Sequence, residues 1–332
     1  MIPQYNIDNY NPVELANWTP VPKVVWLQDT IGGFDENLNN AMLADVNALA
    51  QQHNARITVI SCYAMDSIIQ DKYPNLDFNL YLPDYIWNPL TEYGQHPPLN
   101  YQNFVCSFNG SMHVSRRLLV AIMNRFGWFD PKYSSKNFEF TADIITGHLR
   151  DYIGNEERFY NKFFMSNRDN TFLETKYSFG HNRFDHGKNI YNLENKLVEN
   201  FIHIVSCNTS TSYHPLVDEK FLYSVVTRGL YVAYGAPGWH RQVKQYYGFK
   251  LYQNLFDYRF DSIINPVERL LEMMSMLAKY SVLSADEWRN LYSLEVENIE
   301  FNYDHYRSGD YRRCLEQHWP VLSDSDVKAM VC

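Results

Sequence analysis

The stretch from Asn200 to His240 reads NFIHIVSCNTSTSYHPLVDEKFLYSVVTRGLYVAYGAPGWH and carries the clearest folding signals of the chain. It opens with an apolar, β-branched run of strand length, and a polar loop follows. A helical pattern begins near Asp218 and ends at Arg228-Gly229, and Leu230–Tyr234 then forms a second strand before the turn at Gly235–Gly238. The order strand, loop, helix, strand predicts a right-handed βαβ unit of a parallel sheet.

A second start of the same kind lies earlier in the chain. NFVCSF, residues 103–108, reads as a strand, and a polar loop with Asn109 follows it. Arg116-Arg117 then open a helix that ends near Gly127 and whose apolar side is made by Leu118, Leu119, Ile122 and Phe126. Ligands of parallel sheets bind at the carboxyl ends of the strands, next to helix N-termini, and both loops lie at such positions.

The N-terminal part of the chain has its own α/β pattern. Lys23–Gln28 predicts a strand, about 35–53 a helix and Arg56–Cys62 a further strand, which is the opening of a doubly wound domain. The pattern GxGxxG is absent from this opening, which disfavours dinucleotide binding. With Pro97-Pro98 as a linker, we expect domains at 1–98 and 99–295, and a helical tail at 296–332 that packs back on the first domain.

Composition narrows the functional classes. A chain of 332 residues is long for one core, and its formal charge of −9 disfavours a broad electrostatic contact with nucleic acid or anionic lipid. The N-terminus lacks the features of a signal peptide, and the apolar runs are shorter than a membrane span. The five cysteines form no CxxC pair, which favours a reducing compartment. We therefore expect a cytoplasmic protein without an integral membrane segment.

Cations stand at the starts of two predicted helices of the second domain: Arg116-Arg117 in one and Lys220 in the other. A cation in the first helical turn has the wrong sign for the helix dipole, at a cost of about 0.3–1 kcal/mol. Two such positions on one sheet suggest that an anion between them, such as a pyrophosphate, restores the balance. Solvated surface cations are the equally open alternative. Glu219 either complements the helix dipole or accepts hydrogen bonds from ribose hydroxyls.

These motifs resemble a known family. FVCSFN followed by Arg116, and later DEKFLYSVVTRGLYVAYGA, are similar to the donor-binding domain of fucosyltransferase-like GT-B glycosyltransferases. The order of Gly248-Phe249, Phe256-Asp257 and Glu268-Arg269 is closer still to glycosyltransferase-like proteins of phages and large DNA viruses. The resemblance covers roughly residues 103–128 and 200–275.

The resemblance implies a GT-B fold, in which two doubly wound Rossmann-like domains face a central cleft. It places Arg116 and Lys220 on the donor diphosphate and Glu219 on the ribose. Further donor contacts are expected from Asn109, Asn208 and Tyr213. The chain departs from the family after Ser206, because Cys207-Asn208 stands where an acid is usual.

The activity that the resemblance implies is inverting, metal-independent transfer of a sugar to a hydroxyl of a glycan or glycoprotein. The donor is a nucleotide-diphosphate sugar, and the family's preference suggests GDP as the nucleotide and fucose as the sugar. No cofactor is implied. A virus-encoded enzyme of this kind would act in the host cytoplasm.

The base that takes the acceptor proton is a carboxylate of the first domain in such enzymes. Asp29, which follows a predicted strand, is the first candidate, and Asp66 is the second. For each of them a turn or helix-cap role is the alternative. Metal ligation is not expected at Asp324-Ser-Asp326, where a helix cap fits better, or in GHNRFDHG (180–187), where a polar loop is the default.

A second interpretation is a non-catalytic module that binds a glycan or nucleotide on a degenerate transferase fold. The acid missing at Cys207 is its best support. The sequence lacks the motifs that identify other doubly wound enzymes, such as an epimerase or a phosphatase.

Overall fold

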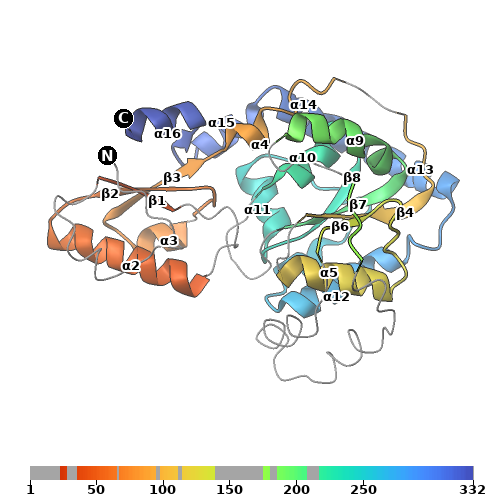
Figure 1. The fold of residues 1–332 in the computed structure, drawn as a ribbon, viewed down its shortest axis with the longest axis horizontal. Coiled ribbons are helices and arrows are strands. Elements are labelled where there is room, and N and C mark those ends of the chain that lie inside the picture. Colours follow the sequence, from red (N-terminus) through yellow and green to blue (C-terminus); the bar gives the residue numbers. More distant parts are fainter. Residues whose placement is uncertain are drawn as a thin grey trace.

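The structure is a computed structural model that describes residues 23–27, 36–65, 67–94, 98–110, 114–138, 175–179, 185–207 and 217–331. Over these ranges the chain is an α/β protein whose named strands pair in parallel, as the sequence predicted (Figure 1). None of the helices within them is long and apolar enough to cross a bilayer.

The first sheet has the strand order β1-β2-β3-β9. Its strands are β1 (Val24–Leu27), β2 (Ile57–Ser61), β3 (Leu76–Tyr81) and β9 (Val321–Leu322), and the helices that accompany the first three are α2 (Glu36–Gln52), α3 (Ser67–Lys72) and α4 (Asp84–Trp87). In Figure 1, α2 and α3 lie below this sheet. A separate apolar core forms there, in which Met42, Val46 and Leu49 of α2 pack with Val25 and Val59 of the strands. Helix α2 confirms the helix predicted over about 35–53.

The C-terminal part of the chain returns to this first sheet. It runs through α13 (Ala285–Ser293), α14 (Val296–Arg307), α15 (Asp310–Glu316), β9 and α16 (Asp324–Val331). The carboxylate of Asp324 accepts hydrogen bonds from the Tyr81 hydroxyl at 2.5 Å and from the backbone N–H of Asp84 at 3.2 Å. The indole N–H of Trp319 donates to the carbonyl of Met65 at 2.7 Å. Asp324 thus begins a helix, and it also fastens that helix to the end of β3.

The second sheet has the order β4-β7-β8, and a two-stranded pair β5-β6 lies beside it. The strands are β4 (Asn103–Cys106), β5 (Phe108–Asn109), β6 (Ser135–Lys136), β7 (Asn200–Ser206) and β8 (Leu230–Tyr234). The accompanying helices are α5 (Val114–Arg125), α9 (His186–Val198), α10 (Glu219–Val226), α11 (Trp239–Tyr246) and α12 (Pro266–Ala278), with a short 3-10 helix at Tyr258–Ser262. Figure 1 shows α9 and α10 on one face and α5 and α12 on the other. The central strand β7 is therefore buried along its whole length.

Several details differ from the sequence prediction, which also did not include strands β3, β6 and β9. NFVCSF is two strands, because Asn103–Cys106 pairs with β7 whereas Phe108–Asn109 pairs with β6. Phe126, predicted on the apolar face of α5, lies beyond its last residue and is 40% exposed. Helix α11 was not predicted, although Gly238 starts it with a left-handed backbone (φ 75°) that favours glycine.

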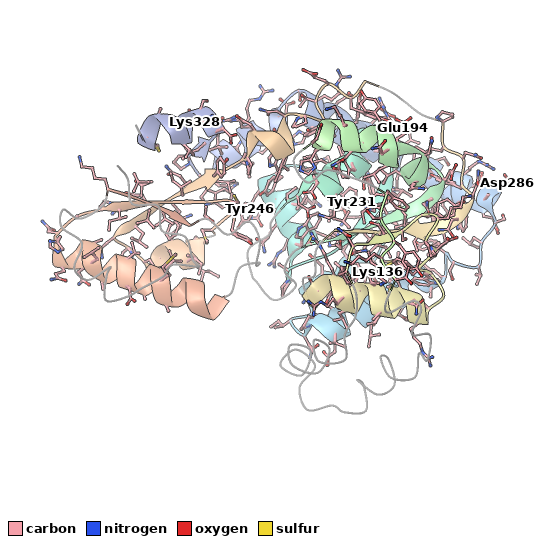
Figure 2. All side chains as sticks on the ribbon, viewed as in Figure 1. Lys136, Glu194, Tyr231, Tyr246, Asp286 and Lys328 are labelled. Atoms are coloured by element: carbon pink, nitrogen blue, oxygen red, sulfur yellow. The ribbon has the colours of Figure 1, made fainter. Side chains whose placement is uncertain are left out.

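Aromatic side chains connect α4 with the elements around the second sheet. The ring of Trp87 stacks on Tyr311 at 4.5 Å and on Tyr247 at 5.8 Å. Tyr246 packs edge-on against Trp319, and Figure 2 shows it between the first sheet and the larger body of the molecule. These three tyrosines thus serve as packing residues.

One polar side chain interrupts the apolar strand β7. His203 is 2% exposed, its Nδ1 is hydrogen-bonded to the hydroxyl of Ser224, and its ring lies 4.9 Å from that of Phe108. Burial, and then the charge of Lys220, lowers the pKa of His203 to about 3. The imidazole is therefore neutral in the folded chain at neutral pH.

His203 predicts an acid-dependent loss of stability. An unfolded histidine takes up a proton below its usual pKa of 6.5, whereas the folded one does so only near 3, so stability falls as pH drops through that window. Between pH 7.5 and pH 5 this histidine alone accounts for about 2 kcal/mol of unfolding free energy. Urea unfolding of wild type and His203→Gln at both pH values measures the difference. An equal pH dependence in the two proteins would contradict it.

Candidate functional site

Helix α10 begins at the carboxyl end of β7 with three charged residues in a row. Asp218 is its N-cap residue, and one carboxylate oxygen, Oδ1, accepts a hydrogen bond from the backbone N–H of Lys220 at 3.1 Å. Glu219 and Lys220 are the first residues of the helix proper. All residues of α10 after Glu219 are buried, and this packing holds the first turn of the helix at the edge of the sheet.

Helix α5 brings a guanidinium to the same place. The Ser115 hydroxyl donates to the carbonyl of Cys207 at 3.0 Å, which fastens the first turn of α5 to the end of β7. Arg116 Nε donates to the carbonyl of Ser206 at 3.4 Å, and its Nη2 lies 3.6 Å from Asp218 Oδ2. Two separate strand–helix connections therefore converge on one point.

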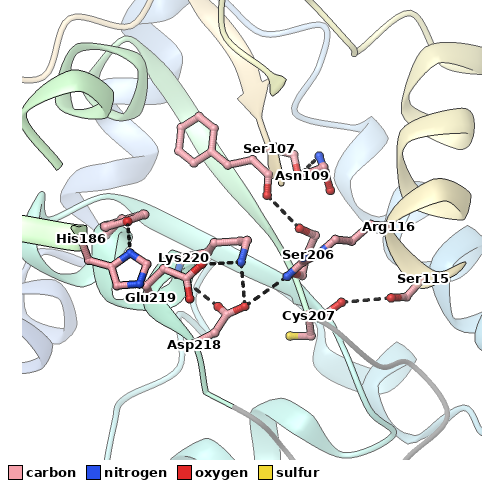
Figure 3. Close-up of polar contacts among 12 residues, drawn as sticks. Ser107, Asn109, Ser115, Arg116, His186, Ser206, Cys207, Asp218, Glu219 and Lys220 are labelled. Carbon is pink, nitrogen blue, oxygen red and sulfur yellow. Dashed lines mark hydrogen bonds and ion pairs between the residues drawn. The ribbon is translucent and has the colours of Figure 1, made fainter. Parts of the chain in front are cut away.

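Arg116, Asp218, Glu219 and Lys220 form what we call the charge cluster (Figure 3). Lys220 Nζ lies 3.0 Å from Asp218 Oδ2 and 2.8 Å from Glu219 Oε1. A single oxygen of Asp218 is thus shared by the lysine and the arginine. The side chains of Arg116, Asp218 and Lys220 are 4%, 5% and 8% exposed, whereas that of Glu219 is 20% exposed. Glu219 is therefore the most exposed member of the cluster.

Asp218 is a residue of the candidate site that sequence reasoning missed. The sequence argument held that an anion between Arg116 and Lys220 restores the charge balance, and the structure places the Asp218 carboxylate there. The signal was in the sequence, because an aspartate directly before a predicted helix is a strong N-cap. The two cations and two carboxylates of the cluster balance each other when all are ionised.

The pKa values of the two carboxyl groups move in opposite directions. Burial raises the pKa of Asp218, although Lys220 opposes the shift. Burial also acts on Glu219, but there Lys220 and His186 outweigh it and bring the pKa to about 2. Glu219 is therefore the firmly ionised acid of the cluster. Burial lowers the pKa of Arg116, and Asp218 limits that effect.

Helix α9 adds a histidine beside the cluster. His186 is 5% exposed, and its Nδ1 is hydrogen-bonded to the Tyr223 hydroxyl at 2.9 Å (Figure 3). Burial lowers the pKa of His186, and the charge of Glu219 partly counters this. Asp185 caps α9 through the backbone N–H of Lys188. The described residues contain no group of histidine, cysteine and acidic side chains that could hold a metal ion.

Asn109 and Cys207 lie nearby in buried positions. The Asn109 side-chain amide donates to the Ser107 hydroxyl at 3.2 Å and to the carbonyl of Ser135 at 3.1 Å, while its Oδ1 has no hydrogen-bond partner among the residues that the structure describes. Cys207 is 3% exposed and burial raises its thiol pKa, so it does not replace an ionised acid. Its sulfur lies close to Gly235, where any added Cβ would approach it to 2.9 Å.

Four of the predicted site residues lie outside the described residues. These are the candidate bases Asp29 and Asp66 and the donor contacts Asn208 and Tyr213. Strands β1 and β2, which end at Leu27 and Ser61, are parallel neighbours. Their carboxyl ends therefore meet at one edge of the first sheet.

Comparison with protein families, with curated proteins and with solved structures finds no match for this chain. The resemblance to fucosyltransferase-like enzymes therefore stays a prediction.

The shared oxygen of Asp218 predicts strong coupling within the cluster. Lys220→Met leaves the buried Asp218 carboxylate and the partly exposed Glu219 carboxylate without their lysine, and we expect it to lower the unfolding free energy by about 3–5 kcal/mol. Adding Asp218→Asn to this variant removes one of these charges and should recover part of the lost unfolding free energy. A double-mutant cycle by urea unfolding measures the coupling. Simple additivity of the two single losses would show that the pair is not coupled.

Proposed function

We propose that this protein is an inverting, metal-independent glycosyltransferase that moves a sugar, fucose by preference, from a nucleotide-diphosphate donor to a glycan hydroxyl. Its fold would be of the GT-B type, with the donor held at the carboxyl edge of the second sheet and the acceptor in a cleft towards the first. A GDP-linked donor is the first candidate. The protein would act in the cytoplasm.

The observation that supports the proposal most is the convergence of Arg116 and Lys220 on Asp218 Oδ2. An oxygen between a guanidinium and an ammonium is the environment that proteins offer to phosphate. The site also lies where ligands of parallel sheets bind, beside a helix N-terminus. Glu219, ionised and the most exposed of the cluster, suits the hydroxyls of a ribose.

In the proposed reaction, the acceptor oxygen attacks C1 of the sugar from the face opposite the diphosphate. A carboxylate, Asp29 first and Asp66 second, takes the proton of the acceptor hydroxyl. The C1–oxygen bond to the diphosphate breaks, and Arg116 and Lys220 stabilise the negative charge of the leaving nucleoside diphosphate. The two cations are held beside each other before the ligand binds, Arg116 by the carbonyl of Ser206 and by Asp218, and Lys220 by Asp218 and Glu219.

A specific observation favours a second function, a module that binds a glycan or nucleotide without turnover. The cations of the cluster already have carboxylate partners, and the residue in the place of the family's acid is a buried thiol. Incubation of the protein with nucleotide sugar and glycan acceptors separates the two functions. Transfer or donor hydrolysis identifies an enzyme, and saturable binding alone identifies a module.

Donor binding is tested by calorimetric titration with GDP-, UDP- and dTDP-sugars, of which we expect a GDP-sugar to bind most tightly. Lys220→Met and Arg116→Met, made one at a time, should each weaken that binding about tenfold or more, because a charged partner of a phosphate is lost. A nucleotide-sugar affinity that is unchanged in both variants would refute the placement of the phosphate.

Arg228→Met serves as the matched control for these variants. Arg228 follows the other end of α10, and its Nε lies 2.9 Å from Glu300 Oε2 with the arginine side chain 11% exposed. The substitution breaks an ion pair just beyond the C-terminal end of α10, whose partner Glu300 is 42% exposed, and it leaves the charge cluster intact. Its donor affinity should therefore match that of wild type.

A further inference from the structure

We propose that Asp218 is an internal competitor of the ligand: its carboxylate occupies the phosphate position between Arg116 and Lys220 and must release both cations when an anionic ligand binds. This inference rests on the proposed function, since it concerns the same site. It adds a residue that sets the affinity and the charge of the ligand that the site accepts.

The two oxygens of Asp218 have separate tasks. Oδ1 accepts the backbone N–H of Lys220 and so caps helix α10. Oδ2 lies 3.0 Å from Lys220 Nζ and 3.6 Å from Arg116 Nη2. The cap needs an oxygen but no charge, whereas the contact with the cations needs the negative charge. One side chain therefore combines a structural role with a role that a ligand phosphate could take over.

Charge balance makes the competition necessary. The cluster holds two cations and two carboxylates, and Figure 3 shows Asp218 between the Lys220 and Arg116 side chains. A diphosphate diester brings two further negative charges. If Asp218 kept its place, like charges would meet in a buried site, which costs several kcal/mol. The ligand must therefore displace or neutralise this carboxylate, and a weakly charged ligand cannot do so.

The experiment compares two variants that each remove one negative charge. Asp218→Asn keeps an oxygen for the helix cap and removes the charge between the cations, since asparagine caps helices as well as aspartate. Glu219→Gln removes the other negative charge that pairs with Lys220 but leaves Asp218 in place. The probe is GDP-fucose, with GDP-mannose and UDP-glucose in parallel, titrated into the full chain at pH 7.5. Asp218→Ser, which also caps, replaces the first variant if that one does not fold.

We expect Asp218→Asn to bind the diphosphate sugar about tenfold more tightly than wild type, in the range that single charge contacts contribute. Glu219→Gln should show no such gain. Equal gains in affinity in both variants would mean that only the net charge of the cluster matters. Unchanged or weaker binding by Asp218→Asn would show that Asp218 does not compete with the ligand. Either result overturns the inference while the proposed function stands. If neither wild type nor Asp218→Asn binds any of the probes, the proposed function fails and the inference with it.

Discussion

The site depends on one carboxylate oxygen shared by two buried cations. Asp218 Oδ2 holds Lys220 from its own helix and Arg116 from the neighbouring strand–helix connection. At this depth each cation needs an opposite charge nearby, because desolvation of an unpaired ion costs several kcal/mol. Glu219 supplies a second one to Lys220, at 2.8 Å. The oxygen therefore fixes the first turns of α5 and α10 relative to each other. Buried ion pairs give little net stability, so a role in positioning explains this one better than a role in stability.

The strand and helix pattern could be predicted where the sequence is strongly periodic. Strand β8 was predicted at its observed residues, and α10 near its observed start. These elements are apolar on the sides that pack, so composition and spacing carry the information. Strand β3, the short strands β6 and β9 and the helix α11 were missed, and β5 was merged with β4 into one predicted strand. Strands β5, β6 and β9 have two residues each, and α11 follows a glycine turn that looked like the end of the unit.

The candidate site was predictable in its cations but not in its charge balance. Helix-dipole reasoning identified Arg116 and Lys220 as residues that need an anion, and it looked for that anion in a ligand. The N-cap role of Asp218 can be predicted from the residues around it. Its contact with Arg116, however, joins positions that are far apart in the sequence. A contact across about a hundred residues is set by the register in which β4 and β7 pair, and the sequence of either strand alone does not determine that register.

The arrangement also separates what the fold contributes from what the residues contribute. A parallel sheet offers a carboxyl edge to any ligand, and many unrelated proteins use that edge. Here the edge carries serine and cysteine carbonyls that fasten α5, and the charges come from helix starts. A neutral residue at 218 would leave two cations of one sign facing the edge, and a basic residue there would repel them. The aspartate therefore lets a guanidinium and an ammonium lie close together in a buried position of the folded chain.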